Sequence, residues 1–240
     1  MAPVDTSGLK LLISDKPDEE RDALAAAFEA CGGAVHRLGR FWDPPSFDPA
    51  TVRVYGADSF CLVLQQKLGF SLCSPDDELL LRVPGALLKR RLTRQTLAQA
   101  QSGPLPMFIK PVVPKQFRGA VYSTADELAE ECRGLAPDTA VIVSEIVTLT
   151  AEVRCFVLNN SVLDAAVYEG MADRAEAIGF ATEVTQALAL PRAVVLDIGN
   201  VPGKGWAVVE FNAAWGAGLN GCNAERVLPA VLAASAPQSS

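Results

Sequence analysis

Two neighbouring strands near the C-terminus constrain this chain most. Asp197 lies in one apolar strand, and Glu210 and Asn212 lie in another at 206–212. The glycine-rich segment 199–205 between them is predicted to be a hairpin turn, because its spacing does not fit a P-loop and no Ser or Thr follows its lysine. Two carboxylates and an amide at the ends of adjacent strands are oxygen ligands of the kind that Mg²⁺ prefers. The hairpin therefore points to nucleotide chemistry.

The composition allows such a site in a globular protein. Of 240 residues, 50% are hydrophobic, which is enough for one large core or two small lobes. No apolar run approaches the roughly 20 residues that a membrane helix needs, and the stretch 11–13 is too short for the core of a signal peptide. We therefore expect a cytoplasmic protein. The net charge of −7 argues against a general nucleic-acid surface and leaves only a local basic groove open.

The cysteines show no pattern of a metal site. They are scattered without a C-x-x-C motif, and His36 is the single histidine, so a zinc site is not expected. We expect reduced, structural thiols, since disulfides are rare in cytosolic proteins.

The chain divides near residue 84, where the Val-Pro-Gly run 83–85 interrupts its pattern. Before this point, apolar periodicity and turn residues indicate an α/β arrangement. The elements expected there are a strand at 11–14, a helix at 19–31, a strand at 34–38, a proline-rich loop at 41–49, and a strand and a helix within 55–68.

Beyond residue 84, a basic loop separates two short strands. The strands at 107–111 and 120–122 flank the segment 114–119, which is basic and ends in glycine, and we expect a β-hairpin. A helix at 124–133 begins with a Ser/Thr cap and has acidic residues in its first turn. The other elements expected are a helix at 87–101, strands at 140–145, 152–158, 162–168, 193–198 and 206–212, and a helix at 172–188.

A basic cluster lies at 89–91, with Arg94 close behind. On the helix expected there, Arg90 and Arg94 share a face, so a solvated helical face is the simpler interpretation. The cluster matters for function only if phosphates lie nearby.

The ordered set of motifs resembles the ATP-grasp superfamily over roughly residues 85–232. The runs Phe-Ile-Lys-Pro, Glu-Val-Arg-Cys-Phe and Glu-Phe-Asn-Ala-Ala-Trp-Gly-Ala-Gly look like the clade named for one conserved arginine and two lysines. The resemblance implies an ATP-grasp fold of two α+β subdomains that grip ATP, preceded by a small α/β lobe. The implied domains are the lobe at 1–84 and an ATP-grasp domain at 85–240, divided into 85–145 with the grasping hairpin, 146–232 with the metal site, and a tail at 233–240.

The resemblance also implies roles for basic residues. Lys110 would contact the α- and β-phosphates of ATP, and either Lys89 or Lys115 would be the second phosphate lysine. The loop 115–119 would close over the triphosphate, with positive charge from Lys115 and Arg118 and backbone freedom from its terminal glycine.

Adenine, ribose and metal contacts are implied in the same way. Glu145, Ile146 and Val147 would bind adenine through backbone groups, and Glu152 would accept the ribose hydroxyls. The metal ligands would be Asp197, Glu210 and Asn212, which would hold Mg²⁺ ions, two in number, that bridge the phosphates of ATP; Mn²⁺ could substitute.

Arg154 lies two residues after Glu152 and therefore faces the same side of its strand. Many ATP-grasp ligases carry an arginine two residues before the metal aspartate, where this chain has Val195. Arg154 would replace that arginine in stabilising the transferred phosphate. The alternative is an arginine paired with Glu152 or Asp164.

Simpler roles stay open for other positions. Lys110 could end a strand, Glu145 and Glu152 could be surface carboxylates, and Asp197 could cap a turn. The segment 216–221 is either a packed loop that leads into a helix or a source of backbone N–H groups for a phosphate or carboxylate.

The implied activity is that of an ATP-dependent ligase that joins a carboxylate to an amine, or to a thiol. Phosphoryl transfer from ATP would give an acyl phosphate and ADP, and the nucleophile would then displace phosphate. Two alternatives stay open: a Mg·ATP-binding regulatory or inactive ATP-grasp module, and an ATP-grasp phosphotransferase.

The sequence leaves the substrates open. Amino acids, small peptides and a protein or RNA end all remain candidates for the carboxylate and the amine. Trp42, Asp43 and the segment 58–60 of the N-terminal lobe are either acceptor contacts or packing and turn residues. No membrane partner is expected, and the oligomeric state is open, with a homodimer as one option.

Overall fold

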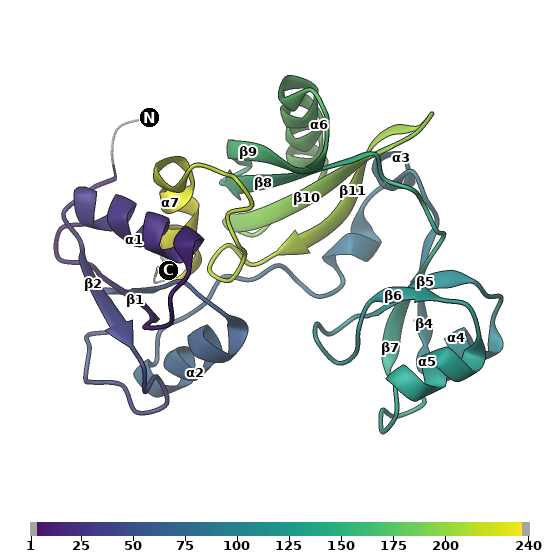
Figure 1. Ribbon diagram of the computed structural model, residues 1–240, viewed down its shortest axis with the longest axis horizontal. Coiled ribbons are helices and arrows are strands. Elements are labelled where there is room, and N and C mark those ends of the chain that lie inside the picture. Colours follow the sequence, from purple (N-terminus) through teal and green to yellow (C-terminus); the bar gives the residue numbers. More distant parts are fainter. Residues whose placement is uncertain (1–3, 237–240) are drawn as a thin grey trace. The chain divides into compact units, whose positions relative to one another are not determined.

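The computed structural model describes residues 4–236, and its internal contacts divide the chain into two compact units (Figure 1). The first unit contains the described residues up to Pro75, then Ala151–Ile198 and those from Val209 onward. The second contains Asp76–Thr150 and Gly199–Val208. The division into domains at 1–84 and 85–240 stays a prediction.

The first unit begins with a three-stranded parallel sheet, in the order β2-β1-β3. Its elements are β1 (Lys10–Ser14), α1 (Glu19–Ala30), β2 (Ala34–Leu38), β3 (Val52–Val54) and α2 (Asp58–Leu68). Helix α1 begins after Asp18, whose carboxylate accepts a hydrogen bond from the backbone N–H of Arg21, as an N-cap residue does. The α/β start expected from the sequence is confirmed.

The same unit carries a four-stranded sheet in the order β11-β10-β8-β9. Its strands are β8 (Ala151–Leu158), β9 (Ser161–Gly170), β10 (Ala193–Val201) and β11 (Gly205–Asn212), and α6 (Arg174–Ala187) packs on β8 and β9 (Figure 1). A tight turn joins β10 to β11, with the N–H of Lys204 donating to the carbonyl of Val201 at 3.0 Å. The hairpin expected in place of a P-loop is confirmed.

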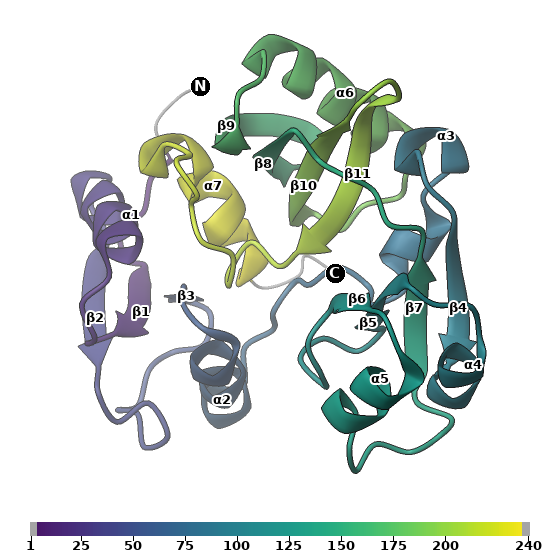
Figure 2. The same ribbon diagram turned by 45° about the vertical axis from the view of Figure 1, so that its right-hand side comes forward.

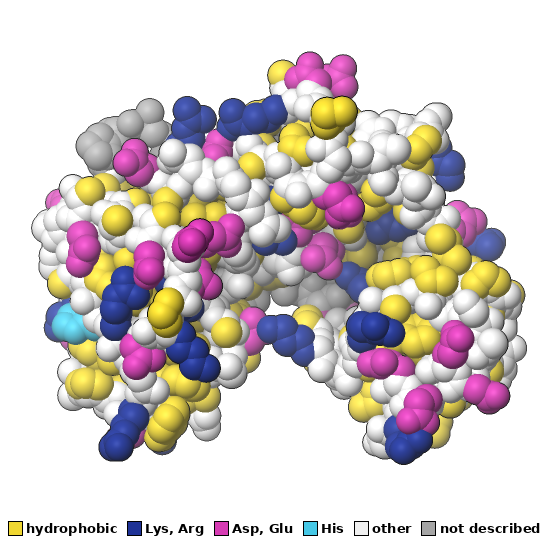
Figure 3. Space-filling model, viewed as in Figure 1, with side chains coloured by type: hydrophobic (Ala, Val, Ile, Leu, Met, Phe, Trp, Pro, Cys, Tyr) yellow, Lys and Arg dark blue, Asp and Glu magenta, His cyan; other side chains and the backbone are white. Residues whose placement is uncertain are grey.

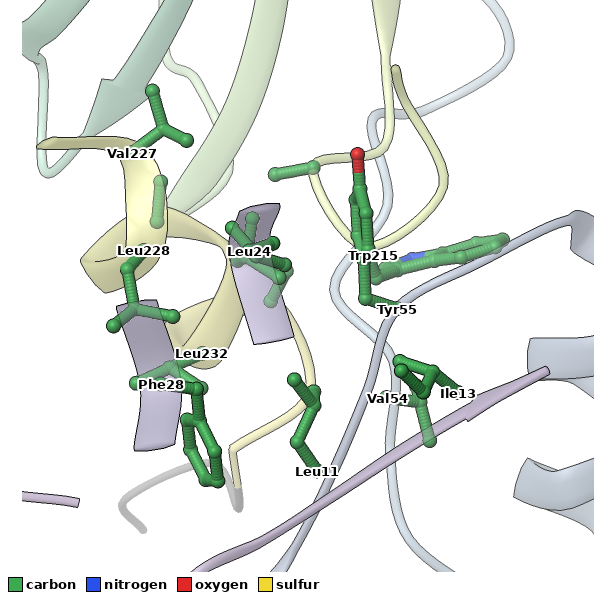
Figure 4. Close-up of a cluster of buried hydrophobic side chains, with 14 of the residues drawn as sticks. Leu11, Ile13, Leu24, Phe28, Val54, Tyr55, Trp215, Val227, Leu228 and Leu232 are labelled. Atoms are coloured by element: carbon green, nitrogen blue, oxygen red, sulfur yellow. The ribbon is translucent and has the colours of Figure 1, made fainter. Parts of the chain in front are cut away.

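Helix α7 (Ala224–Ala234) connects the two sheets of the first unit. It packs against α1 and β3 on one side and against β8 and β9 on the other (Figure 2). The apolar cluster around it includes Leu24, Phe28 and Leu228, which are almost completely buried (Figure 4). Each such side chain contributes about 1.5–3 kcal/mol of burial energy. This core holds the N-terminal sheet and the four-stranded sheet together in one body.

The second unit contains an antiparallel sheet in the order β4-β7-β5-β6. The strands are β4 (Leu92–Thr96), β5 (Met107–Pro111), β6 (Ala120–Tyr122) and β7 (Ala140–Ser144). The short helices are η1 (Leu79–Arg82), α3 (Gly85–Leu88), α4 (Leu97–Ser102) and α5 (Ala125–Glu131), of which α4 and α5 pack together. Thr124 caps α5 by accepting from the N–H of Glu127, so the predicted cap is confirmed. The β5–β6 pairing confirms the predicted hairpin.

The helix expected at 87–101 is wrong. Helix α3 ends at Lys89, which has a left-handed backbone (φ 54°), and Leu92–Thr96 then forms the edge strand β4 on β7. This segment contains two threonines, which fit a strand well, and pairing with β7 satisfies its backbone groups. Arg90 and Arg94 therefore share no helical face. The guanidinium of Arg90 instead donates to the carbonyl of Val208 at 2.7 Å within the same unit.

The surface carries mixed charge. Figure 3 shows acidic and basic side chains interspersed over the face in view. Across residues 4–236, no helix is both long and apolar enough to cross a membrane. All six cysteines are free thiols, and Cys61, Cys132, Cys155 and Cys222 are buried.

Candidate active site

Arg154 and Asp197 form a bidentate ion pair from the adjacent strands β8 and β10. Nε of Arg154 donates to Oδ1 of Asp197 at 2.9 Å, and the Nη2 group donates to Oδ2 at 2.6 Å. Their side chains are only 12% and 2% exposed. The alternative pairing of Arg154 with Glu152 or Asp164 is wrong, because the predicted metal aspartate occupies the guanidinium.

The other two predicted metal ligands lie at the same place. Asn212, at the end of β11, donates from Nδ2 to Oδ2 of Asp197 and to Oε1 of Glu210, both at 3.0 Å. The fold therefore brings the three side chains into direct contact, since β11 lies beside β10. One polar network joins Arg154 to all three.

Burial and charge act in opposite directions on this network. Burial raises the pKa of Asp197, and the hydrogen bonds and charge of Arg154 oppose that rise. Burial also lowers the pKa of Arg154, but its bonds to Asp197 outweigh this effect, so the pKa of Arg154 is raised overall. Two parallel, charge-assisted hydrogen bonds hold the pair in its ionised form.

The donor set fits Mg²⁺. No cluster of three or more His, Cys, Asp or Glu side chains that could hold a metal occurs among the described residues, so any ion here would rest on two carboxylates and an amide. Such hard oxygen donors, completed by nucleotide phosphates and water, are typical of Mg²⁺ sites. Arg154 already supplies one positive charge beside Asp197. A bound cation would require the guanidinium to give up at least one carboxylate oxygen and the Asn212 amide to turn its oxygen inward.

Tyr168 is a member of this site that the sequence did not indicate. Its hydroxyl donates to Oε2 of Glu152 at 2.7 Å, and the guanidinium carbon of Arg154 lies 5.8 Å from the centre of its ring. Tyr168 sits at an irregularity in the β8–β9 ladder, where Glu152 pairs with Glu169 but Val153 pairs with Val167. The alternation pattern gives no sign of such a bulge. Burial, together with the bond to Glu152, raises the pKa of Tyr168, so it remains a donor at neutral pH.

The loop between β11 and α7 is packed on this network. The carbonyl of Gly218 accepts from the Nη1 group of Arg154 at 3.0 Å, and Tyr55 donates its hydroxyl to the carbonyl of Ala217 at 2.9 Å. The backbone N–H groups of Leu219 and Asn220 donate to a carboxylate. Both interpretations of the segment 216–221 are therefore partly right: it is a packed loop leading into a helix, and it also presents N–H groups to an anion.

The predicted phosphate lysines lie in the second unit. Lys110 is partly buried in β5, and a Cβ atom added at Gly119 would lie 2.9 Å from the Cβ of Lys110. Glycine is thus required at 119 for close approach as well as for any freedom in the loop. Lys115, with a left-handed backbone (φ 67°), and Arg118 are exposed.

The base of this loop is anchored. Glu131 accepts from the backbone N–H of Arg118 at 3.1 Å, and Tyr122 donates its hydroxyl to the carbonyl of Arg118 at 2.5 Å. Only the segment before Arg118 extends into solvent, which limits where a hinge could act.

The remaining predicted residues also lie in the second unit. Lys89 accepts at its carbonyl from Nζ of Lys204, at 3.0 Å. Glu145 accepts from the backbone N–H of Arg91 at 2.9 Å, so its carboxylate is engaged while the backbone of Ile146 and Val147 lies outside any strand. This arrangement suits recognition by backbone groups. The carboxylate-bearing residues thus lie in one unit, and the lysines and the segment 145–147 in the other.

A metal-type carboxylate network on one sheet, with lysines on the hairpin and strands of another, defines the class of ATP-grasp proteins. The profile of the second ATP-grasp domain family in the clade named for one arginine and two lysines matches residues 87–230, and the chain therefore belongs to this family. The predicted clade and fold class are confirmed. No curated protein matches the chain.

Several solved structures share the fold. An ATP-grasp RimK domain protein from Sphaerobacter thermophilus is 18% identical, with a TM-score of 0.64 over 93% of this chain and 99% of that one. N5-carboxyaminoimidazole synthase from Aspergillus clavatus is 11% identical, with a TM-score of 0.61 over 98% and 79%. The D-cycloserine synthetase DcsG is 16% identical, with a TM-score of 0.58 over 94% and 98%. At these identities the likeness concerns the fold.

Proposed function

We propose that this chain is an ATP-dependent ligase that joins a carboxylate to an amine, or to a thiol, and releases ADP and phosphate. The observation that carries the proposal is the convergence of Arg154 with Asp197, Glu210 and Asn212 in one buried network. A substrate carboxylate oxygen attacks the γ-phosphorus and ADP leaves. The nucleophile then attacks the carbonyl carbon of the acyl phosphate, phosphate leaves, and the amine loses a proton.

The first unit supplies charge stabilisation. Asp197, Glu210 and Asn212 hold Mg²⁺, which neutralises charge on the triphosphate when it is bound. Arg154, whose raised pKa keeps it protonated, stabilises the equatorial oxygens of the transferring phosphoryl group. Glu152 accepts the ribose hydroxyls, and it would exchange the hydroxyl of Tyr168 for them or share its second oxygen.

The second unit supplies nucleotide contacts. Lys110 binds the α- and β-phosphates, together with Lys89 or Lys115, and Arg118 adds charge at the base of the loop. The backbone of 145–147 binds adenine. The partly buried Lys110 and the engaged carboxylate of Glu145 support these roles, since both are preorganised.

The similar structures support bond formation at the expense of ATP. One is named as a synthetase, and another is named as a synthase in complex with ADP. Amino acids, peptides and macromolecular ends remain the candidate acceptors for this chain.

The test is the dependence of ADP release on each substrate. Protein and Mg·ATP are incubated with mixtures of carboxylates, of amines, of both, or of neither. A ligase releases ADP at full rate only with both. ADP release that needs only a hydroxyl-bearing acceptor would show a phosphotransferase, and binding of Mg·ATP without ADP release in any mixture would show a regulatory module. Mass spectrometry of a cell extract incubated with protein and Mg·ATP then identifies the product.

A further inference from the structure

The carboxylate of Glu20 binds the loop that follows the metal strand. Its Oε2 accepts from the N–H of Leu219 at 2.8 Å, and its Oε1 accepts from the N–H of Asn220 at 2.7 Å. Glu20 is the second residue of α1, and 199 positions separate it from Leu219. Both oxygens of one side chain are therefore used to hold two consecutive amides of a distant loop.

The loop fits closely around this carboxylate. A Cβ atom at Gly218 would lie 2.8 Å from Oε2 of Glu20, so only glycine can occupy this position without a shift. Asn220 and Gly221 follow with left-handed backbones (φ 47° and 86°). A left-handed backbone is costly for a residue with a side chain and persists only where neighbouring contacts hold it. Glu20 supplies such contacts.

The same loop orients Arg154. The carbonyl of Gly218 accepts from the Nη1 group of Arg154, while Nε and the Nη2 group bind Asp197. All three guanidinium nitrogens are thus fixed, one of them by the loop. When Asp197 turns an oxygen to Mg²⁺, the carbonyl of Gly218 is the acceptor that still holds the guanidinium in place.

We propose that Glu20 is a positioning residue for Arg154. It fixes the loop through the amides of Leu219 and Asn220, and the carbonyl of Gly218 then holds the guanidinium toward the transferring phosphoryl group. This inference rests on the proposed ligase function. It assigns to the N-terminal α/β part of the first unit a role in the chemical step, through a path of contacts that lies wholly within that unit.

The test compares Glu20→Gln with Glu19→Gln. Glutamine at 20 can accept from only one of the two amides, because its NH₂ group is a donor. The control removes the same charge one residue earlier, at an exposed position in the same first turn of α1. In Glu20→Gln we expect the amides of Leu219 and Asn220 to exchange with deuterium about tenfold faster or more, the change for losing a bond to a charged group.

The kinetic readout separates positioning from simple structure. In Glu20→Gln we expect kcat for ADP release to fall about 10- to 100-fold, while the KM for Mg·ATP changes less than about twofold. In Glu19→Gln, exchange and kcat should both match the wild type. If Glu20→Gln fails to fold, Gly218→Ala provides the second variant, because its methyl group displaces the loop from Glu20.

Two results would overturn the proposal. Unchanged exchange in the loop would show that Glu20 does not hold it, and faster exchange with unchanged kcat would show a structural role only. A wild type that releases no ADP in any mixture would instead overturn the proposed function and the role of Glu20 in turnover with it. The exchange experiment would still decide whether Glu20 holds the loop.

Discussion

Arg154 and Asp197 join β8 to β10 through two parallel hydrogen bonds, at 2.9 and 2.6 Å, in a part of the sheet almost closed to solvent. Asp197 is also the central ligand of the proposed Mg²⁺ site. The guanidinium and the metal ion therefore compete for the same two oxygens. Metal binding and the position of Arg154 should consequently depend on each other.

Arg154→Ala should remove turnover while nucleotide affinity changes little. Without Mg²⁺ it should also lower the free energy of unfolding by roughly 3–5 kcal/mol, because it leaves the buried carboxylate of Asp197 without its cation. Added Mg²⁺ should restore part of this loss and should stabilise the variant more than the wild type. Urea unfolding with and without Mg²⁺ measures the effect.

Arg226→Ala is the control for that experiment. Arg226 also approaches a buried aspartate, Asp164, but this carboxylate keeps Arg174 and the N–H of Asn223 as partners. The control should show no extra stabilisation by Mg²⁺. Loss of ADP binding in Arg154→Ala would identify Arg154 as a nucleotide-binding or structural residue instead.

Glu210→Ala should abolish the stabilisation of the fold by Mg·ATP. Glu210 raises the pKa of the neighbouring Asp197 through like charge, so its removal relieves repulsion and should leave the ligand-free protein folded. At 100 times the Kd, the wild type should gain about 2.7 kcal/mol. Thermal unfolding with and without Mg·ATP measures this, with the exposed Glu183→Ala as the control. A variant with the full gain would refute the metal assignment.

Lys89 should prove to be the second phosphate lysine. It is partly buried, and its backbone is fixed through Nζ of Lys204, whereas Lys115 is exposed at the loop. A preorganised cation loses less entropy on binding. Lys89→Ala should therefore weaken ATP binding at least about tenfold, and Lys115→Ala clearly less. Calorimetric titration with a non-hydrolysable ATP analogue compares them, and the opposite order would assign the role to Lys115.

Gly119→Ala should weaken ATP binding through Lys110. The added methyl group would lie 2.9 Å from the Cβ of Lys110, so either the loop or Lys110 must shift. Gly134→Ala has open space around its Cβ and serves as the steric control, although its left-handed backbone (φ 89°) adds strain of its own. Affinity for ATP should fall in Gly119→Ala with little change in thermal stability. Unchanged affinity would show that Lys110 does not depend on this contact.

The free energy of unfolding should fall as the pH rises above about 9. Burial raises the pKa of Cys61 and Cys155, and it raises that of Cys222 to about 12, above the ordinary 9.0. The folded protein then keeps protons that the unfolded chain releases, so stability is full below pH 9 and is lost above it, at up to about 1.4 kcal/mol per pH unit and thiol.

Urea midpoints between pH 7.5 and 10 provide this measurement. Alanine at the three buried positions should flatten the decline, and a wild-type midpoint that stays constant to pH 10 would contradict the assigned shifts.

Local sequence patterns were sufficient for much of the site. Lys110 at a strand end, Glu210 and Asn212 on the last strand and Asp197 on its neighbour were identified because each lies in a short run with clear alternation and a turn on one side. The helix expected at 87–101 failed, since pairing of Leu92–Thr96 with β7 outweighed the local helical preference. Tyr168 was missed, because a single-residue bulge leaves no periodic signal.

The sequence by itself determined the order of the strands, the family and the kinds of donor available at the carboxylate network. The tertiary structure alone decided which partners they take. Arg154 pairs with Asp197 and not with Glu152 or Asp164, and Glu20 reaches a loop 199 residues away. The physical reason is range: strand periodicity and turn propensity act over a few residues, whereas a hydrogen bond between distant segments depends on how the whole unit packs and leaves no mark in either segment.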